Sequence, residues 1–305
     1  MVKKKYVIYT IITGKYNEVL QPLCTDDRFD YVLFSNDFKE SQIGVWQIRN
    51  IPKPAEIEPS DNKRLSRYPK SHPETMLSEY KASLYMDANV QIADQWVYDR
   101  VVELSEKNVD YAGIKLIVSD RDDIYRHSYD ICMVCAENDV NAIEEMHALY
   151  KDGYPEHYGL NENNIIFRKH TDKMKAVDEL WWKWIVNYSF RDQFSFMYSL
   201  WKYNIPIVYF LPQGEDSRNS DHFKYIVHNT NPNVARNKWV RQGVLEKLRN
   251  KCRKLSDYHR ERYCRQWVRI CKMPHPKQAL VVCGLFATII NIPLILINVI
   301  KKIKK

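Results

Sequence analysis

The sequence has little glycine, only 8 residues in 305, and no glycine-rich stretch. Proteins that cradle a phosphate on a glycine-rich turn after their first strand need several glycines at that point. The segment after the first apolar run, Thr13-Gly14-Lys15-Tyr16-Asn17, has only one. Internal repeats and low-complexity tracts are also absent from the sequence. A glycine-rich phosphate loop and a repeat architecture are therefore both disfavoured.

The sequence also has neither a recognisable disulfide framework nor a secretory signal. Its 7 cysteines are odd in number and scattered, which is unlike a small disulfide-stapled domain. The N-terminal lysines lead into an apolar run at residues 6–12, which is too short for a signal peptide and has no small-residue cleavage site. We expect this run to be the first strand of a protein with free thiols in a reducing compartment.

Positive charge is concentrated late in the chain. The formal net charge is +8, and the stretch from Arg236 to Lys277 holds fourteen Lys or Arg against three acids. Apolar residues recur among these cations at helical spacing. This pattern predicts a basic amphipathic helical region over residues 231–277, of the kind that lies on an anionic membrane surface. Charge alone does not distinguish such a membrane from nucleic acid or a phosphorylated substrate.

An almost wholly apolar segment follows the basic region. Residues 279–300 are long enough to cross a bilayer, and a lysine-rich tail comes after them. We therefore expect residues 278–305 to form a C-terminal hydrophobic membrane anchor, with a hairpin or an interfacial insertion as alternatives because of Pro293. Since basic flanks stay on the cytoplasmic side, we expect the protein at the cytoplasmic face of the cell membrane, held peripherally or by this single anchor.

Short apolar runs alternate with polar or helical stretches across residues 1–230, which is the pattern of an α/β domain. The runs lie at residues 6–12, 31–34, 45–51, 82–86 and 111–118. Some are continuous rather than alternating, which is typical of strands covered on both faces in a mostly parallel sheet flanked by helices. Ligands bind beyond the carboxyl ends of the strands in such sheets.

Small or polar residues follow three of these runs. They are Thr13-Gly14, Asn36-Asp37 and Asp87-Ala88-Asn89. The carboxylate of Asp87 and the amide oxygen of Asn89 suit a hard divalent cation, whose coordination shell is often completed by substrate phosphates. Asp and Asn at strand ends are also common turn formers, so the triplet taken alone supports either interpretation.

A basic segment precedes the strand that ends at Asp87. It contains Arg64, Arg67 and Lys70, and guanidinium and ammonium groups hold phosphate oxygens well. The alternative is a solvated charged face, where most Lys and Arg side chains lie. Cations placed shortly before a strand-end carboxylate favour a site for a diphosphate and its metal ion.

Taken in order, these pieces resemble a known family. The resemblance covers about the first two thirds of the chain, in segments 6–14, 31–37, 64–92, 160–170 and 181–196. The family is the glycosyltransferase-like domain family formerly of unknown function, found in plant pectin-related Golgi proteins and in bacterial polysaccharide loci. It implies a GT-A-like fold and a metal-dependent transferase, with Mn²⁺ or Mg²⁺ as cofactor and a nucleotide sugar, expected to be a UDP-sugar, as donor.

The resemblance also implies roles for single residues. Asp192 stands where the pattern implies a catalytic base, although Ser189 to Asp192 also has the spacing of a helix N-terminal cap. The triplet departs from the usual two-carboxylate form by ending in Asn89, and a late histidine, His222 or else His228, is expected to complete the metal site with Asp87. Donor contacts are expected from Thr13, Gly14, Asn36, Asp37, Arg64, Arg67, Lys70, Asp87 and Asn89.

The sequence therefore predicts a glycosyltransferase of capsule, lipopolysaccharide or exopolysaccharide biosynthesis, with a glycan or lipid-linked acceptor and no nucleic-acid partner. The polar residues 161–164 are predicted to line the acceptor side, with a polar turn as the alternative. Two other functions stay open. One is a membrane-tethered binding protein with a degenerate transferase domain, and the other is a sugar nucleotidyltransferase, which usually carries the glycine-rich loop that this chain lacks.

Overall fold

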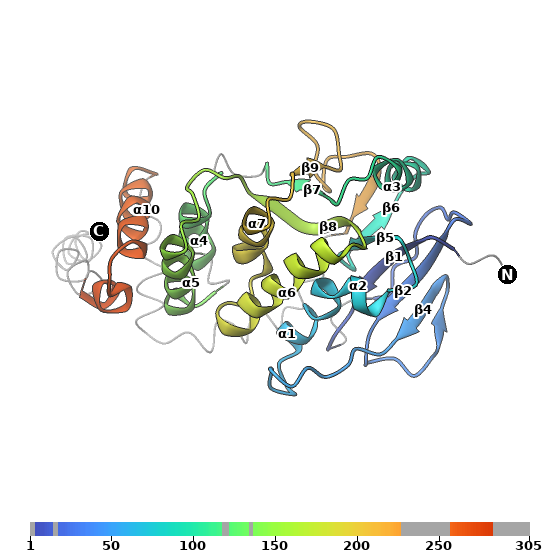
Figure 1. Cartoon of the computed structure of the whole chain (residues 1–305), viewed down its shortest axis with the longest axis horizontal. Coiled ribbons are helices and arrows are strands. Elements are labelled where there is room, and N and C mark those ends of the chain that lie inside the picture. Colours follow the sequence, from blue (N-terminus) through green and yellow to red (C-terminus); the bar gives the residue numbers. More distant parts are fainter. Residues whose placement is uncertain (1–3, 15–17, 118–121, 134–136, 227–256, 283–305) are drawn as a thin grey trace, which may run out of the picture.

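In a computed structural model, the chain folds around an eight-stranded sheet with the strand order β3-β4-β2-β1-β5-β8-β7-β9 (Figure 1). The structure describes residues 4–14, 18–117, 122–133, 137–226 and 257–282. A second sheet pairs β6 with β10 in antiparallel fashion. The strands are β1 (Tyr6–Ile11), β2 (Phe29–Phe34), β3 (Gln42–Ile43), β4 (Trp46–Arg49), β5 (Ala82–Met86), β6 (Val90–Ile92), β7 (Tyr111–Lys115), β8 (Asn161–Lys169), β9 (Val208–Tyr209) and β10 (Phe223–Tyr225).

Strands β4, β2, β1 and β5 run parallel to one another, so their carboxyl ends meet at one edge of the sheet. Strand β8 is antiparallel to both of its neighbours, β5 and β7. The five apolar runs of the sequence correspond to β1, β2, β4, β5 and β7, and the predicted α/β class, with a large sheet flanked by helices, is confirmed. The sheet is mixed. Strands β1, β2 and β5 of its parallel half are the ones followed by the polar residues that the sequence predicted to bind a ligand.

Helices cover both faces of this sheet, which explains why its strands are apolar on both sides. Tyr9 of β1 packs in one core with Trp181 of α6, whereas Ile8 lies in the opposite core with Val101 of α3. The helices are α1 (Asn62–Leu65), the 3₁₀ turn η1 (Pro69–Ser71), α2 (Pro73–Met76), α3 (Trp96–Glu106), α4 (Ile124–Met133), α5 (Asp139–Lys151), α6 (Asp172–Asn187), α7 (Asp192–Lys202) and α10 (Asp257–Cys271).

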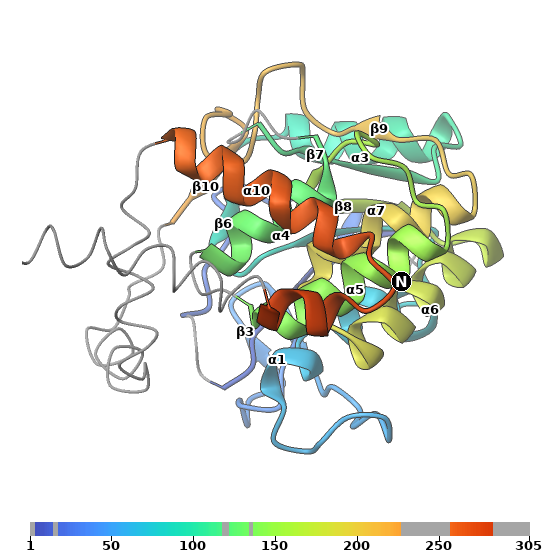
Figure 2. The same ribbon diagram turned by 90° about the vertical axis from the view of Figure 1, so that its left-hand side faces the viewer.

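Helix α10 packs across α4 and α5 at the end of the domain (Figure 2). Its apolar side faces the protein: Trp267 is buried and its indole Nε1 donates to Ser128 Oγ at 2.9 Å. On the same helix, Glu261 pairs with Arg126 of α4 at 2.5 Å. The described part of the predicted basic region, α10, is thus helical. Its apolar side, which the sequence predicted to face a membrane, packs against α4 and α5.

The outer side of α10 is basic. Arg262, Arg265 and Arg269 are exposed, at positions that share one helical face. Most of the predicted anchor at residues 278–305 lies outside the described residues. Among the helices that the structure does describe, none is both long enough and apolar enough to cross a bilayer.

The polar residues 161–164 belong to β8 rather than to a turn, and all four are buried. Two of their amide groups donate to side chains from distant segments. Asn161 Nδ2 donates to Tyr111 OH at 2.6 Å, and Asn164 Nδ2 donates to Ser217 Oγ at 2.6 Å. A strand can begin with polar residues here because such partners offset the cost of burying them.

The stability of the fold should depend on pH through His170, which follows β8. Its ring nitrogens contact Tyr80 O at 3.0 Å and Ser83 Oγ at 2.9 Å. Burial, together with the nearby Arg168 guanidinium, lowers the pKa of His170 from 6.5 to about 4. Below pH 6.5 the unfolded chain therefore gains a proton that the folded chain does not, and stability is lost as the pH falls toward 4.

We expect the His170 contribution to reduce the free energy of unfolding by up to about 3 kcal/mol between pH 6.5 and pH 4. Urea unfolding of the wild type and of His170→Gln at a series of pH values measures it, because glutamine does not titrate in this range. The wild type should lose more stability than the variant over this interval. Equal losses would show that His170 is not the titrating group.

Candidate active site

The site lies where β5 ends, at the carboxyl edge of the parallel half of the sheet. The backbone N–H of Asp87 donates to Asn164 O at 2.8 Å, which fixes the residue just past the strand against β8. The Asp87 side chain is 40% exposed, so its carboxylate can reach a ligand. This is the position at which parallel sheets bind ligands.

Four of the predicted residues come together around this point. Lys70 Nζ lies 2.5 Å from Asp192 Oδ2 and 3.8 Å from Asp87 Oδ1. Arg67 Nε lies 3.7 Å from the same Asp192 oxygen. Lys70 therefore stands between the strand-end carboxylate of Asp87 and Asp192 from a distant part of the chain, with Arg67 beside Asp192.

The surrounding fold holds Lys70 and Asp192 in place. Lys70 belongs to η1, and its carbonyl oxygen accepts from Arg168 Nη2 at 2.6 Å. Asp192 is the first residue of α7, and its carbonyl oxygen accepts from Trp181 Nε1 at 3.0 Å. Both contacts are made by buried side chains, so the backbone beneath the ion pair is fixed by the core.

The electrostatics favour a charged Asp192. Burial raises the pKa of Asp192, but the Lys70 ammonium and the Arg67 guanidinium outweigh it, and the pKa lies below its usual range. A carboxylate stabilised in its charged form is a weak base. In this arrangement Asp192 holds the Lys70 ammonium, and its role as catalytic base stays a prediction. The acid in the first turn of α7 also suits the helix dipole, but the cap predicted at Ser189 is not formed, because Arg191 is the N-cap residue and has no side-chain cap hydrogen bond.

Sequence reasoning missed Tyr85. Its hydroxyl donates to Asp87 Oδ1 at 2.6 Å, and its ring lies under Lys70 Nζ at 4.5 Å. Burial raises the pKa of Tyr85 well above its ordinary value, so the hydroxyl is a stable donor. The signal was available, because residues two apart on a strand share a face and Tyr85 precedes Asp87 by two.

Several of the predicted donor contacts serve the fold instead. Arg64 donates to Ile185 O at 2.8 Å and to Tyr188 O at 2.7 Å, and so satisfies carbonyl groups at the end of α6. The Asn36 amide exchanges hydrogen bonds with the backbone of Ile51 at 2.8 and 3.0 Å. These contacts occupy the polar atoms that the sequence assigned to the donor.

Thr13, Gly14 and Asp37, which were also predicted to contact the donor, have local structural roles. Thr13 Oγ1 donates to Asn62 O at 3.2 Å, which links the end of β1 to α1. Gly14 adopts a φ of +70°, a conformation that favours glycine and lets the chain turn away from the sheet. The Asp37 backbone N–H donates to Ser35 Oγ at 3.1 Å. None of these contacts joins the Lys70 cluster.

The predicted metal partners of Asp87 make other contacts in the fold. The Asn89 side chain is buried and its Nδ2 donates to Ile226 O at 3.0 Å, whereas its Oδ1 has no hydrogen-bond partner among the described residues. His222 Nδ1 lies 2.8 Å from Asp94 Oδ2, and its ring stacks on Trp96 with 4.0 Å between centroids. His228 is outside the described residues. The metal-ligand roles of Asn89 and His222 therefore stay predictions.

A single carboxylate still fits a hard divalent cation. Mg²⁺ in particular is often held by one or two carboxylates and takes its other ligands from water and substrate phosphates. Asp87 could hold such an ion together with a bound diphosphate, while Lys70 and Arg67 contact the phosphate oxygens. The residues present are thus compatible with a cation that enters with its substrate.

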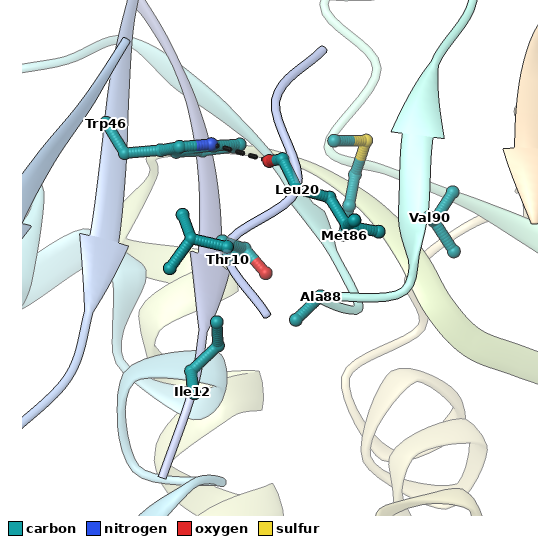
Figure 3. A pocket seen from close by; sticks show the side chains of 8 residues that line it. Thr10, Ile12, Leu20, Trp46, Met86, Ala88 and Val90 are labelled. Atoms are coloured by element: carbon teal, nitrogen blue, oxygen red, sulfur yellow. Dashed lines mark hydrogen bonds between the residues drawn. The ribbon is translucent and has the colours of Figure 1, made fainter. Parts of the chain in front are cut away.

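A small, mostly apolar hollow adjoins the site, between β1, β4 and the end of β5 (Figure 3). Trp46 lies on one side of it and Met86, Ala88 and Val90 on the other, with Thr10 between them. The indole Nε1 of Trp46 donates to Leu20 O at 2.8 Å. This bond keeps the ring in place, so a flat apolar wall stands beside the residue that follows Asp87.

No protein-family model matches the chain, and no curated protein sequence matches it. Several similar solved structures are glycosyltransferases. The bifunctional glycosyltransferase WbbM in its apo form is 12% identical with a TM-score of 0.40, and the match covers 70% of this chain and 39% of that one. Core-mannan synthase A (CmsA/Ktr4) from Aspergillus fumigatus, in a Mn/GDP form, is 11% identical with a TM-score of 0.41, covering 65% and 70%.

A third similar structure is the galactosyltransferase LgtC in complex with donor and acceptor sugar analogs. It is 10% identical with a TM-score of 0.35, and the match covers 67% of this chain and 72% of that one. The chain thus spans less than half of the length of WbbM and about seven tenths of the other two. Identities and TM-scores this low do not transfer an activity, so function must be argued from the residues of the site.

Proposed function

We propose that the chain is a glycosyltransferase that moves a sugar from a nucleotide-diphosphate sugar to a glycan or lipid-linked acceptor in polysaccharide biosynthesis. The observation that carries this proposal is Lys70, whose ammonium lies between Asp87 and Asp192 beside Arg67. A cation-rich site at the carboxyl edge of a parallel sheet, with one exposed carboxylate, suits a diphosphate leaving group.

The chemistry requires charge stabilisation more than acid catalysis. When the bond between the anomeric carbon and the diphosphate oxygen breaks, negative charge grows on that oxygen. An acceptor hydroxyl oxygen forms the new bond to the anomeric carbon, and its proton passes to a diphosphate oxygen or to water. Lys70 and Arg67 are placed to stabilise that charge, and Asp192 keeps the Lys70 ammonium in position. A divalent cation bound with the donor, held through Asp87, would neutralise further charge on the diphosphate.

We also propose that the C-terminal region holds the enzyme at the cytoplasmic face of a membrane. The exposed arginines Arg262, Arg265 and Arg269 of α10 present positive charge outward, and each cation near an anionic surface contributes about 1 kcal/mol of binding. The apolar segment at residues 279–300 would add hydrophobic attachment. Tethering would concentrate a cytosolic enzyme on a lipid-linked acceptor.

A donor screen tests the activity. Purified full-length protein is incubated with Mn²⁺ and single nucleotide sugars, and release of the nucleoside diphosphate is followed. We expect one donor class to be hydrolysed slowly without acceptor. A sugar nucleotidyltransferase would instead release pyrophosphate from a nucleoside triphosphate and a sugar 1-phosphate. If the protein neither binds nor hydrolyses any donor, the glycosyltransferase proposal fails.

A further inference from the structure

A second cluster of metal-binding groups lies away from the Lys70 site. Asp123, Glu156 and His157 each offer one ligand atom, and these three atoms lie within 4.8 Å of one another. Asp123 immediately precedes α4, whereas Glu156 and His157 lie in the loop before β8. Lys272, which follows α10, pairs with Glu156. The cluster therefore sits where three separate segments of the chain meet.

The two oxygens of the Asp123 carboxylate differ in their contacts: Oδ1 is hydrogen bonded within the described part of the chain, and Oδ2 is not. Oδ1 accepts from the backbone N–H groups of Tyr125 at 2.8 Å and Arg126 at 3.3 Å, which caps the start of α4. Oδ2 belongs to a side chain that is 0% exposed, it has no hydrogen-bond partner among the described residues, and it lies 4.0 Å from His157 Nε2. A buried carboxylate oxygen left unpartnered is costly, so its orientation toward His157 calls for a ligand.

His157 is oriented for metal binding by its neighbour. Its Nδ1 lies 2.6 Å from Asp122 Oδ1, and its Nε2 lies 4.0 Å from Asp123 Oδ2. In the neutral ring with Nδ1–H donated to Asp122, the lone pair of Nε2 would be available to a metal ion. A carboxylate behind the ring is the usual support of a histidine that binds metal. The residue also adopts a φ of +59°, an uncommon conformation for a side chain of this size. Such strained residues concentrate at binding sites.

We propose that Asp123, Glu156 and His157 form a second divalent-cation site, of the zinc class, separate from the Asp87 site. Two carboxylate oxygens and one imidazole nitrogen match the three protein ligands that zinc takes beside water. Imidazole is a poor ligand for Mg²⁺ and Ca²⁺, so the donor set selects a transition metal. Bound metal would replace the Lys272 ammonium at Glu156, and would tie the loop before β8 to the start of α4.

Zinc titration of the full-length protein by calorimetry, with thermal unfolding alongside, tests this site. The background is Asp87→Ala, which removes the candidate donor-site carboxylate and leaves the second cluster intact. We expect one zinc ion per chain in this background, with a rise in Tm. His157→Gln should weaken binding at least about tenfold. Asp123→Asn should do the same while keeping the cap of α4, because asparagine retains one side-chain oxygen.

Lys272→Met gives the opposite prediction. Removing the ammonium that competes for Glu156 should tighten zinc binding, a result that a nonspecific surface site would not give. The inference is overturned if the Asp87→Ala protein binds no zinc, or if His157→Gln and Asp123→Asn bind it as tightly as the background. Because no nucleotide sugar is involved, failure here leaves the glycosyltransferase proposal untouched.

Discussion

Replacing Lys70 with methionine is expected to lower kcat for glycosyl transfer about 100- to 1,000-fold, the usual effect of removing one group that stabilises transition-state charge. The ammonium of Lys70 lies 2.5 Å from Asp192 and 3.8 Å from Asp87, so it stands beside the carboxylate through which the proposed cation and diphosphate would bind. Methionine keeps most of the length of the side chain and removes the charge. Steady-state kinetics with the donor identified in the screen measure the loss.

Lys63→Met is the matched control, because Lys63 belongs to the same basic segment but lies over the Phe190 ring at 4.4 Å, away from both carboxylates. It should keep nearly full activity. Since Lys70→Met removes the closest cation from the buried Asp192, the double variant Lys70→Met/Asp192→Asn checks that inactivity is not unfolding. The double variant should be folded and inactive. If Lys70→Met is as active as Lys63→Met, Lys70 does not act on the leaving group.

Replacing Arg168 with methionine should destabilise the protein by about 3–5 kcal/mol, the cost of removing one partner from a buried ion pair. The Arg168 side chain is fully buried, and Nη1 donates to Asp178 Oδ2 at 2.8 Å. Nη2 donates to Tyr9 OH at 2.5 Å and to Lys70 O at 2.6 Å. One guanidinium therefore joins β1, β8, α6 and η1, and urea unfolding at neutral pH measures its contribution.

The double variant Arg168→Met/Asp178→Leu should recover much of this loss, because it removes the charge on both sides of the pair. Burial raises the pKa of Asp178, so a carboxylate left there without the Arg168 guanidinium is costly, and leucine removes that cost. An Arg168→Met protein as stable as the wild type would contradict the account of this network. A double variant less stable than the single one would show that packing rather than charge sets the cost.

The sequence predicted the sheet well because the strands that build its core are continuous apolar runs. It missed the start of β8 because residues 161–164 are polar, and their partners, such as Tyr111 and Ser217, are distant in sequence. It predicted the helical character of α10 in the same way, from periodicity. Periodicity shows that a helix has an apolar side, but not whether that side meets a membrane or, as for Trp267, the protein itself.

Part of the candidate site could be predicted because several of its residues are close together in the sequence. Arg67, Lys70 and Asp87 lie close in sequence to one strand end, and Asp192 was reached through the family resemblance. Arg64 and Asn36 have the chemistry expected of donor contacts, and in the fold their partners include backbone groups of Ile185 and Ile51. Only the folded chain shows such internal partners, and the donor contacts assigned to these two residues stay predictions.

Metal-dependent binding of the donor tests the central claim most directly. Thermal shift is measured with the nucleotide sugar, with and without Mn²⁺, for the wild type, for Asp87→Ala and for His222→Gln as a control whose ring is paired with Asp94. We expect Mn²⁺ to increase the donor-induced shift in the wild type and in His222→Gln, and to have no effect in Asp87→Ala. A metal-dependent shift that survives in Asp87→Ala would contradict the assignment of this site.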